Sequence, residues 1–443
     1  MLEENIHQHS EENFIYFHLI LQAMKQRLST ILLLLMMPLL LSAQVYRTQI
    51  LSPKVMSLQA HLADAWNKAP VIELHSEQQV SISFDEMSHE YLRLAYRIRH
   101  CNADWQASSM NELDYLEGFS ENDLPEGATS EATTVEYTHY ELKLPNEDVR
   151  LKLSGNYVVE IFDRDAAEEE AMLLQVCFSV LDRKIGVDAK VSAQTDQAYN
   201  DKYQQLSFEL QTPMGMIERP DSDIKILIRQ NRRCDNQVFG ISPYMTSGNS
   251  IRYQHHPSLV FAAGNEYRRF EISSHKMAGM GVDRLFFERP YYHAVLFADV
   301  LRNRSYTYDQ DQNGRYYIRN READALQTDY QMVHFSLPVD RPFAQALYLL
   351  GDIQQANPQA SQSLMYNEEN HAYECQLLLK QGQYNYMYAL AVSSRNSENE
   401  SLSLSQTEGD FWPTANEYQI FVYYCPFAGE YDQLIGYQEL VFN

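Results

Sequence analysis

The sequence has few cysteines, and they lie far apart. Its 443 residues contain five, Cys101, Cys177, Cys234, Cys375 and Cys425, and no two of them are closer than 50 positions. This spacing excludes the C-x-x-C pairs of zinc and redox sites, and an odd, scattered set is not typical of a disulfide framework. A single disulfide is left open. Because Cys177 and Cys425 lie in apolar stretches, we expect them to pack as small buried hydrophobic residues.

Basic residues are also scarce. Beyond residue 43 the chain has 33 Lys and Arg against 56 Asp and Glu, which gives a formal charge of −23. Binding to nucleic acid needs basic patches that neutralise phosphates, and an anionic lipid surface repels a protein of this charge. The composition therefore predicts that nucleic acid is not a partner and favours a soluble protein or one with a basic partner.

Long apolar runs are missing except for one near the N-terminus, Leu28–Leu41. A short basic stretch with Lys25 and Arg27 precedes the run, and Ser42-Ala43 ends it. These are the three parts of a secretory signal peptide, and the run is shorter than the roughly 20 residues that span a bilayer.

We therefore predict a leader over residues 1–43, in which 24–43 is the signal peptide and 1–23 is an upstream extension from a mis-called start. The mature chain is expected to begin near Gln44. Since no cysteine follows Ala43 directly, we do not expect a lipid anchor at the cleavage point.

The sequence is rich in aromatic residues, with 31 Tyr and 19 Phe, which favour pleated, half-buried strands. Short stretches with alternating apolar and polar residues recur between turn-forming clusters, and no stretch indicates a helix of more than one or two turns. The alternating stretches are 71–74, 80–84, 92–98, 140–144, 157–162, 205–210, 224–228, 267–272, 333–337, 346–352, 373–379, 384–388 and 417–424. The pattern predicts an all-β protein of tandem immunoglobulin-like or other β-sandwich domains.

We place the predicted domains at 45–182, 183–329 and 330–443. The middle domain is expected to close with a hairpin of 306–308 and 316–318, because Asn313-Gly314 is a strong hairpin signal. The polar, acidic stretch 393–407 is predicted to be a mobile loop.

Four groups of side chains are candidates for a metal-binding, catalytic or sugar-binding site. Asp309–Gly314 matches the first half of a calcium loop, but the twelfth position is Asn320 rather than glutamate, so we expect a solvated turn. His255 and His256 are adjacent, and neighbours on a strand face opposite ways, which disfavours a shared metal ion. The carboxylate clusters Glu121, Asp123, Glu126 and Glu168, Glu169, Glu170 are interpreted as solvated loops, although folding could bring a hydrolase pair together.

The fourth group is an aromatic stripe, Tyr384, Tyr386 and Tyr388, on one face of a strand. It could stack on a sugar, but polar neighbours on the other face make it more typical of a core. Nucleophile elbows, P-loops and dinucleotide-binding glycine motifs are absent. We therefore predict no catalytic, cofactor-binding or metal-binding residues, no cofactor and no small-molecule substrate, and expect the protein not to be an enzyme.

Several blocks of sequence resemble the type IX secretion system plug protein family of Bacteroidota. The blocks occur in order along about 45–440: 100–109, 112–119, 137–140, 142–149, 153–157, 263–268, 422–424 and 431–437. The resemblance implies a periplasmic, non-enzymatic protein at the inner face of the outer membrane. Its partner would be the outer-membrane β-barrel translocon, which such a plug occludes when no substrate is present.

The last predicted domain separately resembles an early-set immunoglobulin-like sandwich of the glycogen-binding sort, through Leu349–Asp352 and Lys380–Tyr386. The tryptophan expected soon after Gly351-Asp352 is missing, since the chain continues Ile353-Gln354-Gln355. An exported carbohydrate-binding protein is the alternative interpretation, and it requires exposed, coplanar aromatic rings on one sheet.

Overall fold

The computed structural model describes most of the chain beyond the predicted leader. The described residues are 25, 44–88, 90, 92–167, 171–196, 201–322, 324–392, 401–427 and 429–442. The predicted leader lies outside them except for Lys25. Within them, no helix is long and apolar enough to cross a membrane. All sheets lie in Val45–Asn443, which forms one of the two compact units of the chain.

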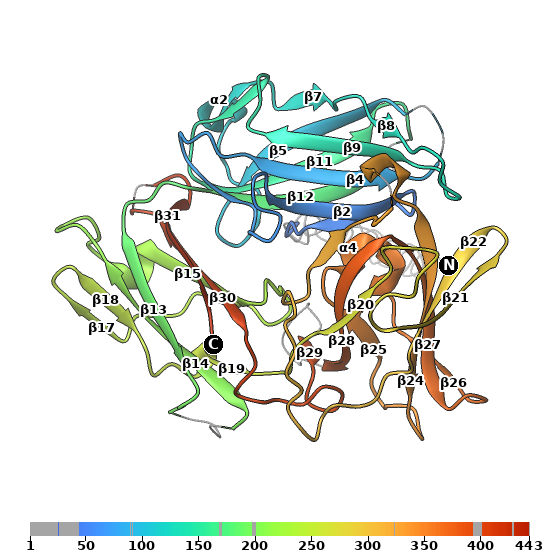
Figure 1. Cartoon of the computed structure of the whole chain (residues 1–443). Coiled ribbons are helices and arrows are strands. Elements are labelled where there is room, and N and C mark those ends of the chain that lie inside the picture. The colour runs from blue at the N-terminus through green and yellow to red at the C-terminus, as the bar shows by residue number, and fades with distance from the viewer. Residues whose placement is uncertain are drawn as a thin grey trace, which may run out of the picture. The chain divides into compact units, whose positions relative to one another are not determined.

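The first of three β-sandwiches, here the N-terminal sandwich, uses strands between residues 49 and 181 (Figure 1). One sheet has the order β1-β12-β11-β5-β7, with β3 parallel to β12, and faces a sheet of order β2-β4-β9-β8; β6 and β10 form a separate ribbon. Alternate residues such as Phe84, Tyr96 and Val159 fill the space between the sheets, as the sequence pattern predicts. The strands are β1 (Gln49–Ile50), β2 (Val55–Leu62), β3 (Val71–Glu73), β4 (Val80–Glu86), β5 (Leu94–Cys101), β6 (Leu116–Gly118), β7 (Glu121–Asp123), β8 (Ala128–Thr129), β9 (Thr138–Leu144), β10 (Val149–Leu151), β11 (Gly155–Asp163) and β12 (Met172–Leu181).

The middle sandwich combines strands from two distant parts of the chain. A sheet of order β13-β14-β18-β17, with β19 also on β14, packs against a sheet of order β16-β15-β30-β31. Leu206, Ile226 and Ile420 lie in the core between them. The strands are β13 (Gly186–Ser192), β14 (Tyr203–Gln211), β15 (Ile224–Gln230), β16 (Val238–Phe239), β17 (Met245–Ser247), β18 (Ser250–Tyr253), β19 (Val260–Ala262), β30 (Glu417–Tyr424) and β31 (Gln433–Val441).

The third sandwich lies between these parts in sequence. The long strand β28 pairs with β20, β23, β25 and β29, and the facing sheet has the order β21-β22-β24-β27-β26. Phe270, Phe335 and Tyr386 pack edge to face in its core. The strands are β20 (Arg268–Glu271), β21 (Val282–Glu288), β22 (Tyr291–Leu296), β23 (Tyr316–Ile318), β24 (Tyr330–Pro338), β25 (Leu347–Leu350), β26 (Met365–Asn367), β27 (Ala372–Lys380), β28 (Gly382–Val392) and β29 (Ser401–Ser403).

Helices in the described part of the chain are at most four residues long. They are α2 (Glu112–Tyr115), α3 (Pro220–Asp223) and α4 (Ile353–Ala356), with the 3-10 turns η2 (Pro257–Leu259), η3 (Ala325–Gln327) and η4 (Pro358–Ser361). The all-β class and the sandwich architecture predicted from the sequence are thus confirmed.

The strand pairing does not follow the predicted division at residue 330. Figure 1 shows the C-terminal strand β30 beside β15, with which it pairs over seven residues from Ile224–Tyr424 to Gln230–Tyr418. In the other direction, β20 to β23 precede residue 330 but belong to the third sandwich. Alternation in a sequence indicates which face of a strand is buried and leaves its pairing partner unspecified. The domain limits 45–182, 183–329 and 330–443 stay a prediction.

The hairpin predicted around Asn313-Gly314 was right in its turn and wrong in its strand pairing. Both residues have positive φ, 52° and 90°, and the Arg315 amide donates to the Gln312 carbonyl, so the tight turn is present. However, 306–308 forms no strand, and β23 pairs with β28 instead. The hydroxyl of Tyr306 donates to Glu266 at 2.6 Å, and this hydrogen bond holds the segment 306–308 away from β23.

The predicted mobile loop 393–407 was wrong at its end. Residues 401–403 form β29 on β28, and Thr407 is fully buried, with its hydroxyl donating to the Tyr388 carbonyl at 2.5 Å. Residues 393–400 lie outside the described part. A polar composition could not show that the Thr407 hydroxyl has a buried carbonyl acceptor in β28.

Candidate functional site

The side chains singled out as a half calcium loop are used by the protein itself. Asp309 forms an ion pair with Arg269, and the Asp311 carboxylate accepts from the amides of Tyr267 and Asn313. Burial raises the pKa of Asp311 above its ordinary value. These contacts make Asp311 an anchor of the turn.

The adjacent histidines have separate partners. His255 Nδ1 lies 2.5 Å from a carboxylate oxygen of Asp196, and His256 Nδ1 accepts from the Ser258 amide at 3.2 Å, at the start of η2. They are not brought together on one site. In the described ranges, no three His, Cys, Asp or Glu residues are grouped so that they could hold a metal ion.

The first carboxylate cluster is a surface ion-pair network. Glu121 and Asp123 both accept from Arg164, at 2.6 and 3.0 Å, and Glu126 is exposed. Glu168, Glu169 and Glu170 lie outside the described residues.

The aromatic stripe is core. Tyr384 and Tyr388 are fully buried, Tyr386 is nearly so, and the hydroxyls of Tyr386 and Tyr388 donate to Asp299 at 2.7 and 2.9 Å. Ile353, where a sugar-binding tryptophan was sought, is buried in α4. The stripe therefore cannot serve as the exposed platform that the carbohydrate-binding alternative requires.

The fold brings buried charged side chains together at the junctions between the sandwiches. Between the N-terminal and third sandwiches, Asp85 of β4 is fully buried and accepts from Lys380 Nζ at 2.6 Å and from the Tyr330 hydroxyl at 2.7 Å. His139 Nδ1 donates to the other carboxylate oxygen at 2.7 Å. The Lys380 ammonium lies 3.9 Å from the centre of the Tyr137 ring.

The charges in this junction compensate each other. Burial alone would raise the pKa of Asp85, but Lys380 and His139 outweigh it and hold that pKa below its usual range. Burial lowers the pKa of Lys380. A buried carboxylate with three donors is satisfied, whereas one that has lost its cation is costly. The junction is therefore built for permanent contact.

The junction between the N-terminal and middle sandwiches is made by the sequence blocks that carry the family resemblance. The Asn156 side-chain oxygen accepts from the hydroxyls of Tyr423, at 2.9 Å, and Ser179, at 2.8 Å. Asp432 accepts from the Ala103 amide at 3.0 Å and from Lys225 Nζ at 2.8 Å. These blocks, distant in sequence, form one buried polar seam.

His100 belongs to the same seam. Its Nε2 donates to the Ser154 carbonyl at 3.3 Å, so in the neutral ring Nδ1 accepts from the Ser108 hydroxyl at 2.9 Å. Burial lowers the pKa of His100 to about 4. Gly155 has a φ of 137°, and a Cβ there would lie 2.5 Å from His100 Nε2, which explains the glycine beside this ring.

The middle and third sandwiches meet through buried ion pairs. Glu417 of β30 accepts from Arg232 at 2.9 Å and from Arg315 at 2.8 Å. Within the third sandwich, Glu408 is fully buried and accepts from Arg268 of β20 at 3.0 Å and from Arg302 at 2.7 Å. Each carboxylate thus joins two arginines that are distant in sequence.

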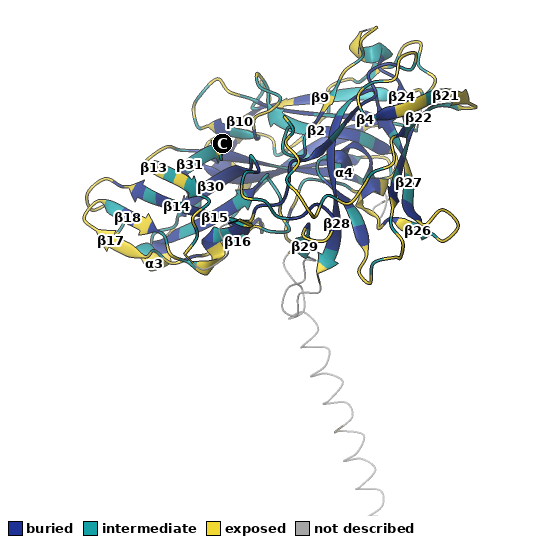
Figure 2. Ribbon diagram, turned by 60° about the horizontal axis from the view of Figure 1, so that its bottom comes forward, coloured by how far each residue is buried: buried dark blue, intermediate teal, exposed yellow. Residues whose placement is uncertain are grey.

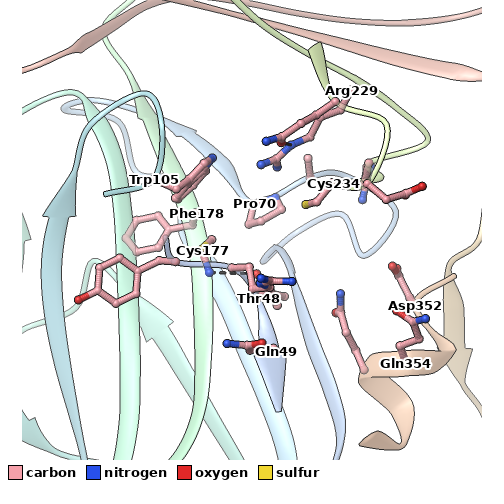
Figure 3. Close-up of a pocket in the computed structure, with 18 of the residues that line it drawn as sticks. Thr48, Gln49, Pro70, Trp105, Cys177, Phe178, Arg229, Cys234, Asp352 and Gln354 are labelled. Atoms are coloured by element: carbon pink, nitrogen blue, oxygen red, sulfur yellow. Dashed lines mark hydrogen bonds between the residues drawn. The ribbon is translucent and has the colours of Figure 1, made fainter. Parts of the chain in front are cut away.

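A cavity of about 670 Å³ lies where all three sandwiches meet. In Figure 3, Trp105 and Cys177 come from the N-terminal sandwich, Arg229 from the middle one, and Asp352 from the third. Arg229 lies over the Trp105 ring, 5.6 Å from its centre, and burial raises the pKa of Asp352. The cavity is mixed in polarity, without a cluster of groups that indicates a reaction.

None of the five cysteines forms a disulfide in the structure. Cys101 and Cys177 are neighbours in the small apolar cluster with Tyr46 and Val158, and burial raises the pKa of both thiols. Cys234 is exposed. Cys177 packs partly buried against this cluster, and Cys425 is partly buried as well, so neither is as deeply buried as expected.

Comparison with known proteins agrees with the sequence blocks. Residues 55–182, which form nearly all of the N-terminal sandwich, match the family model described as Type 9 secretion system plug protein 1st domain. No curated protein matches the chain. A solved structure of a hypothetical protein from Parabacteroides merdae ATCC 43184 is 36% identical, with a TM-score of 0.85 over 90% of this chain and 100% of that one.

Proposed function

Because the chain belongs to the type 9 secretion system plug protein family, we propose that it is the plug that occludes the outer-membrane β-barrel translocon from the periplasm. Family membership implies export and association with the secretion machinery. Its partner is the barrel, and its place is the inner face of the outer membrane.

The observation that best supports this role is how the sandwiches are joined. Fully buried Asp85 and nearly buried Glu417 are each held by a cation of another sandwich, Asp85 by Lys380 and Glu417 by Arg315. Removing one partner from such a pair costs about 3–5 kcal/mol, so the sandwiches do not separate easily. A body that does not open is suited to steric occlusion, which needs bulk and no moving part.

The same observations support a protein without catalysis. The sequence candidates for chemistry are dispersed: Asp311 anchors a turn, Glu121 is held by Arg164, and the tyrosine stripe is core. The family and the fold favour a non-enzymatic protein. We extend this to a plug whose effect depends on its presence at the barrel and on no single side chain.

Deletion of the gene tests the proposal. Cells without the protein should become more permeable to large antibiotics, while export largely persists; a strain that also lacks the translocon is the control and should not show the change. Unchanged permeability in the single deletion would contradict the plug role.

Complementation separates occlusion from chemistry. In the deletion strain, the Asp309→Asn and His256→Gln variants should restore the low permeability to large antibiotics fully. If one of these variants folds but leaves the cells permeable, the protein has a metal-dependent or catalytic role rather than the role of a plug.

A pull-down addresses the partner. The tagged protein should recover the barrel translocon from outer-membrane extracts, and the complex should weaken with salt if the charge of −23 contributes, since screening shortens to roughly 10 Å at 0.1 M. Recovery of a different partner and no barrel would refute the docking.

A further inference from the structure

The hairpin of β21 and β22 in the third sandwich carries two exposed aromatic side chains on one strand. Phe287 is 51% exposed and Phe286 37% exposed, although they point to opposite faces of β21. Figure 2 shows the end of this hairpin as exposed. Large apolar side chains open to solvent on both faces of one strand indicate an interaction surface.

β21 is also an edge strand. Its one pairing among the described residues is with β22, so its other side presents backbone groups without a strand partner. The register with β22 shifts between Val282 and Arg284 and is regular from there to Glu288. The regular segment Arg284–Glu288 can accept a further strand.

Two rows of rings run across the sheet and end at this edge. On one face, Phe286 stacks on His293 with centroids 4.8 Å apart, and His293 is followed by His334 at 5.1 Å. On the other, Phe287 contacts Tyr292 at 4.9 Å. Aromatic cross-strand pairs stabilise a sheet, and here each row stops at a strand with no neighbour.

We propose that β21 pairs antiparallel with β21 of a second copy of this chain, in the register that places Phe286 opposite Phe286 of that copy. Arg284 then faces Glu288 of the second copy, and Glu288 faces its Arg284. Leu285 faces Phe287 on the other side of the sheet. The row of rings that ends at Phe286 continues across the two-fold axis, and each Phe287 contacts Leu285 of the other copy.

The charges select this register over its neighbours. A shift by one position in one direction places Glu288 opposite Asp283, and a shift in the other places Arg284 opposite Arg289. Like charges directly opposite each other destabilise a pair of strands. Charges of one sign along an edge strand would disfavour its pairing with any other strand. β21 instead carries one positive and one negative side chain, Arg284 and Glu288, which can form ion pairs with their counterparts in a second copy.

The predicted dimer is weak. Five paired residues and one continuous row of rings form a contact below the roughly 1,200 Å² of a standard stable interface. We therefore expect association that depends on concentration in the micromolar range, with a Kd on the order of 10 µM.

Charge reversal tests the register. In sedimentation velocity, the exported protein should shift from monomer to dimer as its concentration rises. Arg284→Glu alone and Glu288→Arg alone should weaken the dimer at least tenfold, and the double variant should restore it, because the swapped charges again face each other. Mixing the two single variants should also give dimers. Lys190→Glu, on exposed edge strand β13, is the matched control and should change nothing.

Cross-linking gives a second readout, because a disulfide traps even a weak dimer. With Cys234→Ser as background, Phe286→Cys should form a disulfide-linked dimer on oxidation with diamide, because directly opposed residues are close enough for a disulfide. Phe287→Cys, which faces Leu285 in this register, should not.

Four results would overturn the proposal: a monomer at all concentrations, a dimer insensitive to both single reversals, a double variant that stays monomeric, or equal cross-linking at positions 286 and 287. A monomer whose hairpin cross-links to the translocon would show that the barrel occupies this edge instead. The dimer is independent of the plug function, so either can fail alone.

Discussion

Replacement of Lys380 by methionine should strongly destabilise the protein. The change removes the cation that lies 2.6 Å from the fully buried Asp85 carboxylate and keeps the length of the side chain. Loss of one partner of a buried ion pair costs about 3–5 kcal/mol. Because His139 and Tyr330 still donate to Asp85, we expect the lower end, about 3 kcal/mol, in the free energy of unfolding.

Urea unfolding measures this effect. The midpoint should fall while the slope of free energy against urea stays the same, since the same surface is exposed on unfolding. The double variant Asp85→Asn with Lys380→Met should recover part of the loss, because no charge is left buried without a partner.

The matched control is Lys54→Met, which breaks the exposed pair Lys54–Glu90 at 3.5 Å and should cost less than about 1 kcal/mol. If Lys380→Met costs as little as the control, Asp85 is not held as described, and the argument for a permanently closed junction fails.

Other perturbations test the remaining interactions. Since the pKa of His100 falls to about 4 from 6.5, the unfolded state binds more protons between these values; stability should be complete above pH 6.5 and drop by about 3 kcal/mol toward pH 4, and His100→Gln should flatten this slope in urea titrations. Glu408→Gln should lower stability by at least about 2 kcal/mol in the same assay, as two arginines lose a buried anion. Mass spectrometry after brief alkylation should find exposed Cys234 modified first and Cys101 last, because Cys101 is fully buried and its pKa rises to about 12. N-terminal sequencing should begin near Gln44 and not at Met1, and circular dichroism should show far less than the roughly 30% helix of an average protein.

Much of the local structure could be read from the sequence. The alternating stretches at 80–84, 157–162 and 373–379 all lie within strands, because alternation reports which residues face a core. Asn313-Gly314 forms the predicted turn through positive φ angles that this pair tolerates well. The tyrosine stripe was correctly interpreted as core.

The strand partners could not be read in this way. β30 has almost every residue buried, which indicates a central strand but does not reveal that its neighbour is β15, some 190 positions earlier. The seam of Asn156, Tyr423 and Asp432 was missed for the same reason. The one signal for it was that these residues lie in blocks that resemble a known family.

The sequence by itself determined the class of the protein: an acidic, β-rich chain whose family blocks point to a secretion plug. The charge and the β content follow from composition and local periodicity, and the family follows from the resemblance of sequence blocks; none of these needs knowledge of distant contacts. Only the tertiary structure decided that the last two sandwiches interleave, that Asp85 and Glu408 are buried with their cations, and that β21 remains an edge. Those outcomes depend on which surfaces meet, and the free energy of burying a charge is set by neighbours that are hundreds of residues away in the chain.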